Sequence, residues 1–232
     1  MKGNVFKNVW RGIGSHNASY GSYYTNVKIY NNTFTDIDTY AIMAVNMKKV
    51  SIKNNRISNA GAGIDFKYYN PGRIKKSKYV KGSRNSKAYL TISGNKISIV
   101  KKKMGGNRKF AIRIYGAYQG RKSYGMPKAN YCVKNVSIYK NKIKSKYSGI
   151  LLTDTKNSKI TRNTINLRPS RKKRYSSSCI TLNAGSKKNR ISRNKCYYSN
   201  RYGVETTVPK KSNKVYKNRI KKCRKGKTGF SK

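Results

Sequence analysis

Acidic side chains are scarce in this 232-residue sequence, which has five Asp and Glu residues against 56 Lys and Arg. The formal net charge is therefore +51. The acidic residues are Asp36, Asp38, Asp65, Asp154 and Glu205. Five acidic residues leave few candidates for the paired carboxylates of a hydrolase or for the several acidic ligands of a calcium site. The composition favours a polyanionic partner instead.

Histidine and cysteine are also scarce. His16 is the single histidine, and the four cysteines, Cys132, Cys179, Cys196 and Cys223, form no C-x-x-C pair. This spacing predicts neither a zinc site nor a thiol–histidine site. We therefore expect no metal and no cofactor, and we interpret the cysteines as small buried apolar residues.

Long apolar runs are missing as well. No stretch approaches the 18 apolar residues of a membrane-spanning helix, so no span is predicted. The first residues, from Met1 onward, lack the apolar segment of a secretory signal peptide.

A nine-residue pattern recurs along nearly the whole chain and defines its organisation. Its copies are residues 27–35, 50–58, 90–98, 136–144, 158–166, 189–197 and 213–221. The sixth position is always asparagine: Asn32, Asn55, Asn95, Asn141, Asn163, Asn194 and Asn218. Each copy is followed by a second apolar alternation, often opened by Gly or Ala, as in residues 63–66 and 149–152. The spacing indicates a unit of about 22 to 24 residues that is lengthened by insertions.

Short strands with one inward face and one asparagine at a fixed corner predict a solenoid with parallel, stacked turns. An asparagine in a tight turn tolerates the left-handed backbone region and can bond to the asparagine of the next turn. We expect these seven asparagines to form a ladder and the inward Ile, Val, Leu and Phe residues to stack in columns.

The pattern I-x-x-N-x-I, followed by G-I-x and an apolar residue, resembles the repeats of the right-handed β-helix (pectin-lyase-like) superfamily over about residues 4–221. The resemblance implies an all-β, right-handed parallel β-helix of about seven to eight turns with basic loop insertions. Residues 1–221 would form this domain and residues 222–232 a basic tail. The first turn begins in mid-repeat, so we expect that an N-terminal cap and a signal peptide were lost with an upstream segment. The fold alone does not specify an activity.

The insertions, at residues 67–87, 99–109, 115–134 and 168–177, are the most basic stretches. In the superfamily's layout such loops line a groove beside the G-I-x strand, where polysaccharide binds. Basic side chains interleaved with flat aromatic ones suit a sugar chain or a nucleobase. The predicted substrate-binding residues here are Tyr68, Tyr69, Arg73, Lys75, Lys76 and Lys78.

A second basic feature lies in the regular turns, at the position after each ladder asparagine. This column reads Thr33, Arg56, Lys96, Lys142, Thr164, Lys195 and Arg219. Its members would stack about 4.8 Å apart. Like charges at that spacing repel, so the column indicates either a surface selected for a polyanion or a merely lysine-rich composition.

The outward positions of the G-I-x strands bring Asp65 and Arg113 onto neighbouring turns, with Lys67 and Tyr115 two residues further along. One interpretation is a site in which Asp65, Arg113 and Glu205 position a sugar. A β-eliminating lyase acting on uronates could then use Arg113, Lys67 and Tyr115 to neutralise the carboxylate and move protons. The other interpretation is an ordinary surface ion pair worth about 0.2 to 1 kcal/mol.

The sequence therefore predicts a secreted or cell-surface β-helix module that binds an acidic polysaccharide or wall polymer. A polysaccharide lyase is the alternative, and whether the protein is an enzyme stays open. Non-specific nucleic-acid binding follows from the charge alone, because no nucleic-acid motif supports it.

Overall fold

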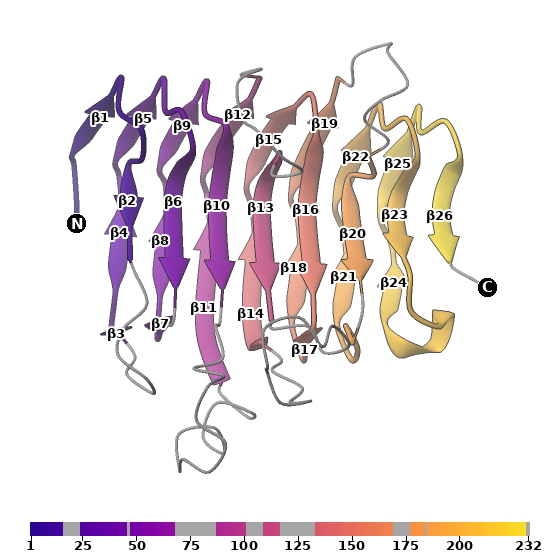
Figure 1. Ribbon diagram of the computed structural model, residues 1–232. Helices are drawn as coiled ribbons and strands as arrows, with labels where there is room; N and C mark the ends of the chain where they lie inside the picture. Colours follow the sequence, from indigo (N-terminus) through magenta and orange to yellow (C-terminus); the bar gives the residue numbers. More distant parts are fainter. Residues whose placement is uncertain are drawn as a thin grey trace, which may run out of the picture.

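The computed structural model describes residues 1–15, 24–45, 47–67, 87–100, 109–116, 133–168, 177–183 and 185–230. Apart from one 3₁₀ turn, η1 (Lys210–Ser212), the elements of these residues are short strands. The strands form three long parallel sheets, in which each strand pairs with its equivalent one turn later. The chain is thus a right-handed parallel β-helix, with turns that lie side by side from the N-terminus to the C-terminus (Figure 1). The predicted fold is confirmed.

The first half of each nine-residue repeat forms sheet A. Its strands are β4 (Lys28–Tyr30), β8 (Ser51–Lys53), β11 (Lys87–Ser93), β14 (Val133–Tyr139), β18 (Lys159–Thr161), β21 (Arg190–Ser192) and β24 (Lys214–Tyr216), with β17 (Thr155–Lys156) pairing beside β14. A separate pair joins β3 (Tyr24–Thr25) and β7 (Met47–Lys48).

The second half of each repeat forms sheet B. Its strands are β1 (Val5–Lys7), β5 (Thr33–Thr35), β9 (Arg56–Ser58), β12 (Lys96–Ile99), β15 (Lys142–Ser145), β19 (Thr164–Leu167), β22 (Lys195–Tyr197) and β25 (Arg219–Lys221). The β1 strand adds one turn before the first complete repeat.

The apolar alternation that follows each repeat forms sheet C. Its strands are β2 (Ile13–Gly14), β6 (Tyr40–Val45), β10 (Ala62–Lys67), β13 (Phe110–Tyr115), β16 (Ser148–Thr153), β20 (Ile180–Asn183), β23 (Tyr202–Thr206) and β26 (Gly226–Phe230). Strand β26 pairs with β23, so the coil continues into the segment predicted as a basic tail. The apolar alternation fades there, but the backbone ladder persists because parallel pairing needs no particular side chain.

The ladder asparagines lie in one line at the corner between sheets A and B, as predicted. Each of them before Asn218 donates from Nδ2 to Oδ1 of the asparagine one turn later, with distances of 2.9 to 3.1 Å. The ladder begins one turn earlier than predicted, at Asn4. A buried amide column of this kind satisfies corner backbone groups that no strand pairs.

The left-handed residue at this corner is not the ladder asparagine but the residue before it. Positive φ occurs at Gly3, Asn31, Asn54, Gly94, Lys140, Arg162, Arg193 and Lys217. The ladder asparagine itself does not take this conformation, and its side chain points inward to reach the next turn. The preceding residue makes the bend, and its side chain is left to face solvent.

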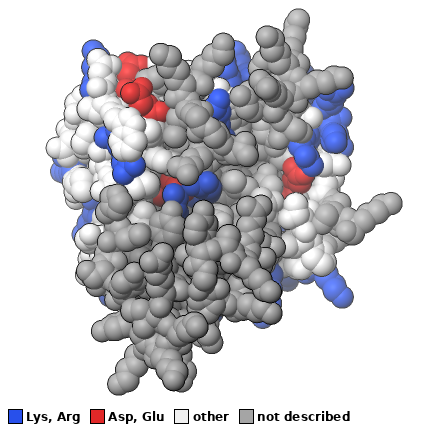
Figure 2. Space-filling view, in the orientation of Figure 1, with Lys and Arg blue, Asp and Glu red and all other residues white. Residues whose placement is uncertain are grey.

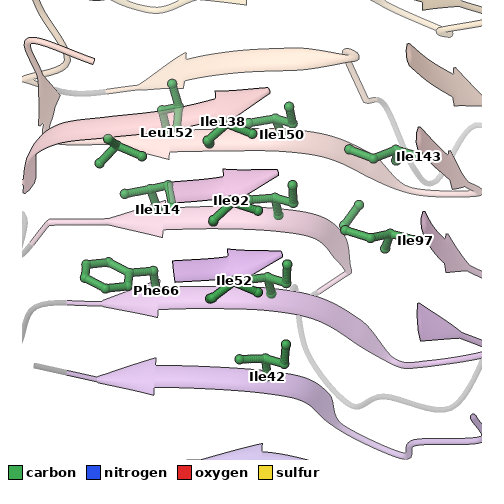
Figure 3. Packing of buried hydrophobic residues seen from close by; sticks show 14 of the residues in the cluster. Ile42, Ile52, Phe66, Ile92, Ile97, Ile114, Ile138, Ile143, Ile150 and Leu152 are labelled. Carbon is green, nitrogen blue, oxygen red and sulfur yellow. The ribbon is translucent and has the colours of Figure 1, made fainter. Parts of the chain in front are cut away.

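The interior is filled by apolar columns that run along the axis (Figure 3). Sheet A contributes a column that begins with Ile29 and continues through Ile52, Ile92, Ile138, Ile160 and Ile191, each with no exposed surface. Only its last member, Val215, is partly buried. Because every turn repeats these positions, one continuous core forms without any helix.

Candidate functional site

The exposed corner between sheets A and B is strongly basic over the last four turns. We call the following residues the basic ridge: Lys140, Lys142, Lys159, Arg162, Arg190, Arg193, Lys195, Lys214, Lys217 and Arg219. All ten are exposed. They come from three positions of the repeat: the left-handed corner, the first outward residue of sheet B and the first outward residue of sheet A.

Strand register places like charges of the ridge directly beside one another. Lys195 pairs with Arg219 in sheet B, and Arg190 pairs with both Lys159 and Lys214 in sheet A. The predicted column from Thr33 to Arg219 is therefore in register. Neighbouring members lie about 4.8 Å apart, a spacing at which like charges destabilise a sheet.

No carboxylate offsets this repulsion, because the chain's acidic residues lie elsewhere on the coil. In the earlier turns the same left-handed corner carries Gly3, Asn31, Asn54 and Gly94 instead of cations. The scaffold therefore does not need positive charge at this corner. Cations at this left-handed position are confined to the last four turns, whereas the first outward position of sheet B also carries them in earlier turns, at Arg56 and Lys96.

The positive field of the ridge helps to lower the pKa of Tyr216. A hydrogen bond with the Ser192 side chain is the largest cause that lowers the pKa of this exposed phenol, followed by the charges of Arg190, Arg193 and Lys217. Three ridge cations thus favour a negative charge on the same surface.

A shallow groove of about 320 Å³ lies on sheet A next to the ridge. It crosses three turns, and its lining residues are Tyr89, Leu90, Thr91, Asn135, Val136, Ser137, Asn157 and Lys159. Tyr89, Asn135 and Asn157 are left-handed residues at the equivalent corner of successive turns. The half-exposed Tyr89 ring presents a flat aromatic face beside amides, hydroxyls and the ridge residue Lys159.

The second charged cluster is centred on Asp65, on the outer face of sheet C. Arg113 donates from Nε to Oδ1 and from Nη2 to Oδ2, both at 2.8 Å. Lys67 Nζ lies 2.9 Å from Oδ2. The register of β10 and β13 pairs Asp65 with Arg113 and Lys67 with Tyr115. The predicted neighbours are therefore brought together.

This cluster is not an ordinary surface ion pair. The Asp65 side chain has no exposed surface, and the side chains of Lys67 and Arg113 are 9% and 16% exposed. The Arg113 guanidinium lies 4.3 Å from the centre of the Phe110 ring, and Lys67 Nζ lies 5.4 Å from that of Tyr40. Burial against aromatic rings makes the two cations depend on Asp65 far more than the surface estimate allows.

Glu205 lies on the same outer face but far from Asp65. The column from Asp65 to Glu205 passes through Arg113, Leu151 and Thr181. Four strand steps correspond to about 19 Å. Glu205 accepts a hydrogen bond from Ser178 at 2.6 Å and pairs with Arg201, so it forms a separate ion pair. Figure 2 shows acidic groups as separate spots on this face.

The remaining predicted binding residues, Tyr68, Tyr69, Arg73, Lys75, Lys76 and Lys78, lie outside the described residues. Their roles stay predictions.

Asp154, which sequence reasoning did not single out, is a buried carboxyl group at a left-handed corner. Its Oδ2 has no hydrogen-bond partner. Burial raises the pKa of Asp154 to about 6, although the charge of Lys156 acts in the opposite direction. The burial of Asp154 could not be predicted from the sequence, because it depends on how the neighbouring turns cover this corner.

Asp154→Asn is expected to stabilise the protein at neutral pH by about 1 to 2 kcal/mol, after allowance for solvent screening. A raised carboxyl pKa favours the folded state most below the unfolded value of 3.8, and this advantage is lost as the pH rises through about 6. Urea unfolding of the parent and the variant between pH 4 and 8 would measure the difference. Asp38→Asn, at an exposed position, is the control. Equal pH profiles for parent and Asp154→Asn would contradict the prediction.

Two family models each match a part of the chain. Residues 11–125 match the right-handed β-helix region, and residues 120–225 match the family described as periplasmic copper-binding protein (NosD). No curated protein and no solved structure matches significantly. In the described ranges, no group of three or more His, Cys, Asp or Glu side chains is placed to hold a metal ion. Within the same ranges no helix is long and apolar enough to cross a membrane.

Proposed function

Because this chain is a right-handed parallel β-helix, whose turns repeat each surface position in a straight column, we propose that it binds an acidic polysaccharide along the basic ridge. The observation that carries the proposal is the in-register stacking of like charges, as in Lys195 beside Arg219 and Arg190 beside Lys214. Such stacking costs stability in the free protein. A bound polyanion would remove that cost by placing negative charge between the cations.

The geometry of the ridge favours an extended polymer over a nucleic-acid duplex. Its cations follow a straight line parallel to the axis, with one step of about 4.8 Å per turn. A uronate polymer also carries its carboxylates along an extended chain. The phosphates of a duplex instead follow a helical path, which would leave a straight ridge after a few contacts.

The groove beside the ridge supports a sugar chain in particular. The face of Tyr89 can stack on the C–H face of a pyranose ring, while Asn135 and Asn157 can bond to its hydroxyls. Lys159 belongs to both the groove and the ridge, so a single chain can contact both. Acidic wall polymers lie outside the cytoplasm, and the periplasmic description of one matching family supports that location.

Neutralising four ridge cations, Arg162, Arg193, Lys195 and Lys217, to Gln is expected to weaken binding of polygalacturonate about tenfold or more. The control variant carries Gln at the exposed residues Lys7, Lys28, Lys49 and Lys53, and therefore has the same net charge. Its affinity should fall less than about threefold at 0.15 M salt, where the Debye length is about 8 Å. Calorimetric titration of the parent and both variants would measure the three affinities.

Equal losses in the two variants would show that binding is a diffuse effect of net charge. Tighter binding of duplex DNA than of polygalacturonate at the same salt would favour a nucleic-acid partner. The cluster of Arg113, Lys67 and Tyr115 supports a second candidate, a uronate lyase. Release of an ultraviolet-absorbing unsaturated product, lost in a folded Arg113→Lys variant, would favour the lyase.

A further inference from the structure

One position of the basic ridge carries a cation in four successive turns without interruption. It is the left-handed corner between sheets A and B, and its residues are Lys140, Arg162, Arg193 and Lys217. All four side chains are exposed. In the neighbouring column on sheet B, Thr164 lies between Lys142 and Lys195. The corner column, as we call these four residues, is therefore the part of the ridge that offers one cation in every turn.

The four corner residues share one backbone geometry. Their φ angles lie between 50° and 56°. The backbone N–H groups of Lys140, Arg162 and Arg193 each donate to a carbonyl oxygen of the next turn, at 3.2 to 3.4 Å. Similar φ angles and stacked backbones direct the Cα–Cβ bonds the same way. The four side chains therefore leave the corner in parallel, about 4.8 Å apart.

Lysine and arginine are not the residues that this conformation favours. A left-handed backbone suits glycine and asparagine, which occupy the same corner in earlier turns as Gly3, Asn31, Asn54 and Gly94. Elsewhere in the described turns, left-handed lysines occur at Lys49, Lys188 and Lys222, but never in two successive turns at one corner. The corner column thus keeps its cations against both backbone preference and mutual repulsion, which favours a function for the charges themselves.

A hydroxyl-bearing residue immediately precedes each corner cation. These residues are Tyr139, Thr161, Ser192 and Tyr216, which pair in register along sheet A. Tyr216 is exposed and Tyr139 and Thr161 are partly exposed, whereas Ser192 is largely buried. A cation beside a hydroxyl suits an acidic sugar, because the cation can pair with the carboxylate while the hydroxyl bonds to a sugar hydroxyl.

We propose that the corner column recognises a run of at least four consecutive acidic sugars in a linear chain, with one carboxylate beside each cation. The inference rests on the polysaccharide function proposed above and specifies its substrate. A sugar of an extended polymer is about as long as one turn of the coil is high, so sugars and cations stay in step. Neutral, esterified sugars within the run reduce the number of carboxylates that can pair with the column at the same time.

The first test compares two pectins with the same fraction of methyl-esterified carboxyl groups, one with its free carboxylates in blocks and one with them at random. Their average charge density is equal, so long-range attraction is the same for both. The parent protein should bind the block pectin about tenfold more tightly at 0.15 M salt, because several corner cations are then paired at once. Calorimetric titration would measure both affinities.

Arg162→Asn with Arg193→Asn interrupts the column at its centre and should reduce the block preference to less than about twofold. Asparagine already occupies this corner at Asn31 and Asn54, so the double variant should fold, with a urea midpoint equal to or above that of the parent. The matched control is Lys49→Asn with Lys222→Asn. It makes the same kind of change at exposed left-handed residues of other corners, and it should keep the full block preference.

Oligogalacturonates of defined length provide the second test. Affinity should rise about tenfold or more from two to four sugars and change by less than about twofold from six to eight, because the column then has no further cation to pair. A steady rise beyond six sugars, or equal binding of the two pectins, would overturn the proposed run of sugars while ridge-dependent binding of polygalacturonate still stands. If polygalacturonate binds the parent and the four-Gln ridge variant equally, the proposed function fails and this inference fails with it.

Discussion

Replacing Asn141 by Leu is expected to lower the free energy of unfolding by about 3 to 5 kcal/mol, because several buried polar groups lose their partners together. Asn141 Oδ1 accepts bonds from the backbone N–H and Nδ2 of Asn95, at 3.0 and 2.9 Å. Its Nδ2 donates to Ile92 O and to Asn163 Oδ1, each at 2.9 Å. Asn141 has no exposed surface, so water cannot replace these bonds.

Asn218→Leu is the matched control for that variant. Asn218 is the last member of the ladder and is only partly buried. It accepts hydrogen bonds from the backbone N–H and Nδ2 of Asn194, and no ladder asparagine follows it among the described residues. We expect about half the loss seen at Asn141, and urea unfolding of both variants would measure the two values. Equal losses would mean that the ladder stabilises each turn separately and does not depend on its continuity.

Asp65→Asn is expected to destabilise the protein by about 3 to 5 kcal/mol, the usual cost of removing one partner of a buried ion pair. The carboxylate balances two cations, Arg113 and Lys67, which are largely buried. Without the carboxylate, both cations stay buried but no longer have a negative charge beside them. The amide of Asn has the same shape, so the change tests charge and not packing.

Glu205→Gln provides the comparison for Asp65, because it removes a carboxylate from the same face of sheet C. Its partner Arg201 is 33% exposed, and an ion pair in such a position contributes about 0.2 to 1 kcal/mol. Chemical unfolding at low and high salt should show a large, salt-insensitive loss for Asp65→Asn and a small, salt-sensitive loss for Glu205→Gln. Losses of similar size would show that the Asp65 cluster behaves as a surface pair.

Burial explains why the sequence underestimated the Asp65 cluster. Alternation along a strand places Asp65 and Arg113 on the outer face of sheet C, and an outer face is normally wet. Tyr40 and Phe110, from the turns on either side of β10, also lie on that face, and their ring centres are 6.3 Å apart. Their contact across the small Ala62 was not evident from the sequence, because it depends on ring orientation.

The sequence by itself determined the coil, the ladder and the register. In a parallel solenoid the residue at one position of a repeat always lies next to its equivalent one turn later, whatever the length of the insertion between them. Aligning the repeats in the sequence therefore predicts which residues lie next to one another. This is why the pairs Lys195–Arg219 and Asp65–Arg113 could be predicted from the sequence.

Contacts between different positions of the repeat were decided only by the tertiary structure. Asn31 and Asn32 are adjacent asparagines, and only the geometry of the corner shows that the first takes the left-handed conformation while the second enters the ladder. The burial of the Asp154 carboxyl also depends on how corners from different turns close over one another. Such contacts depend on side-chain direction and local backbone path, and the repeat leaves both of these free to vary from turn to turn.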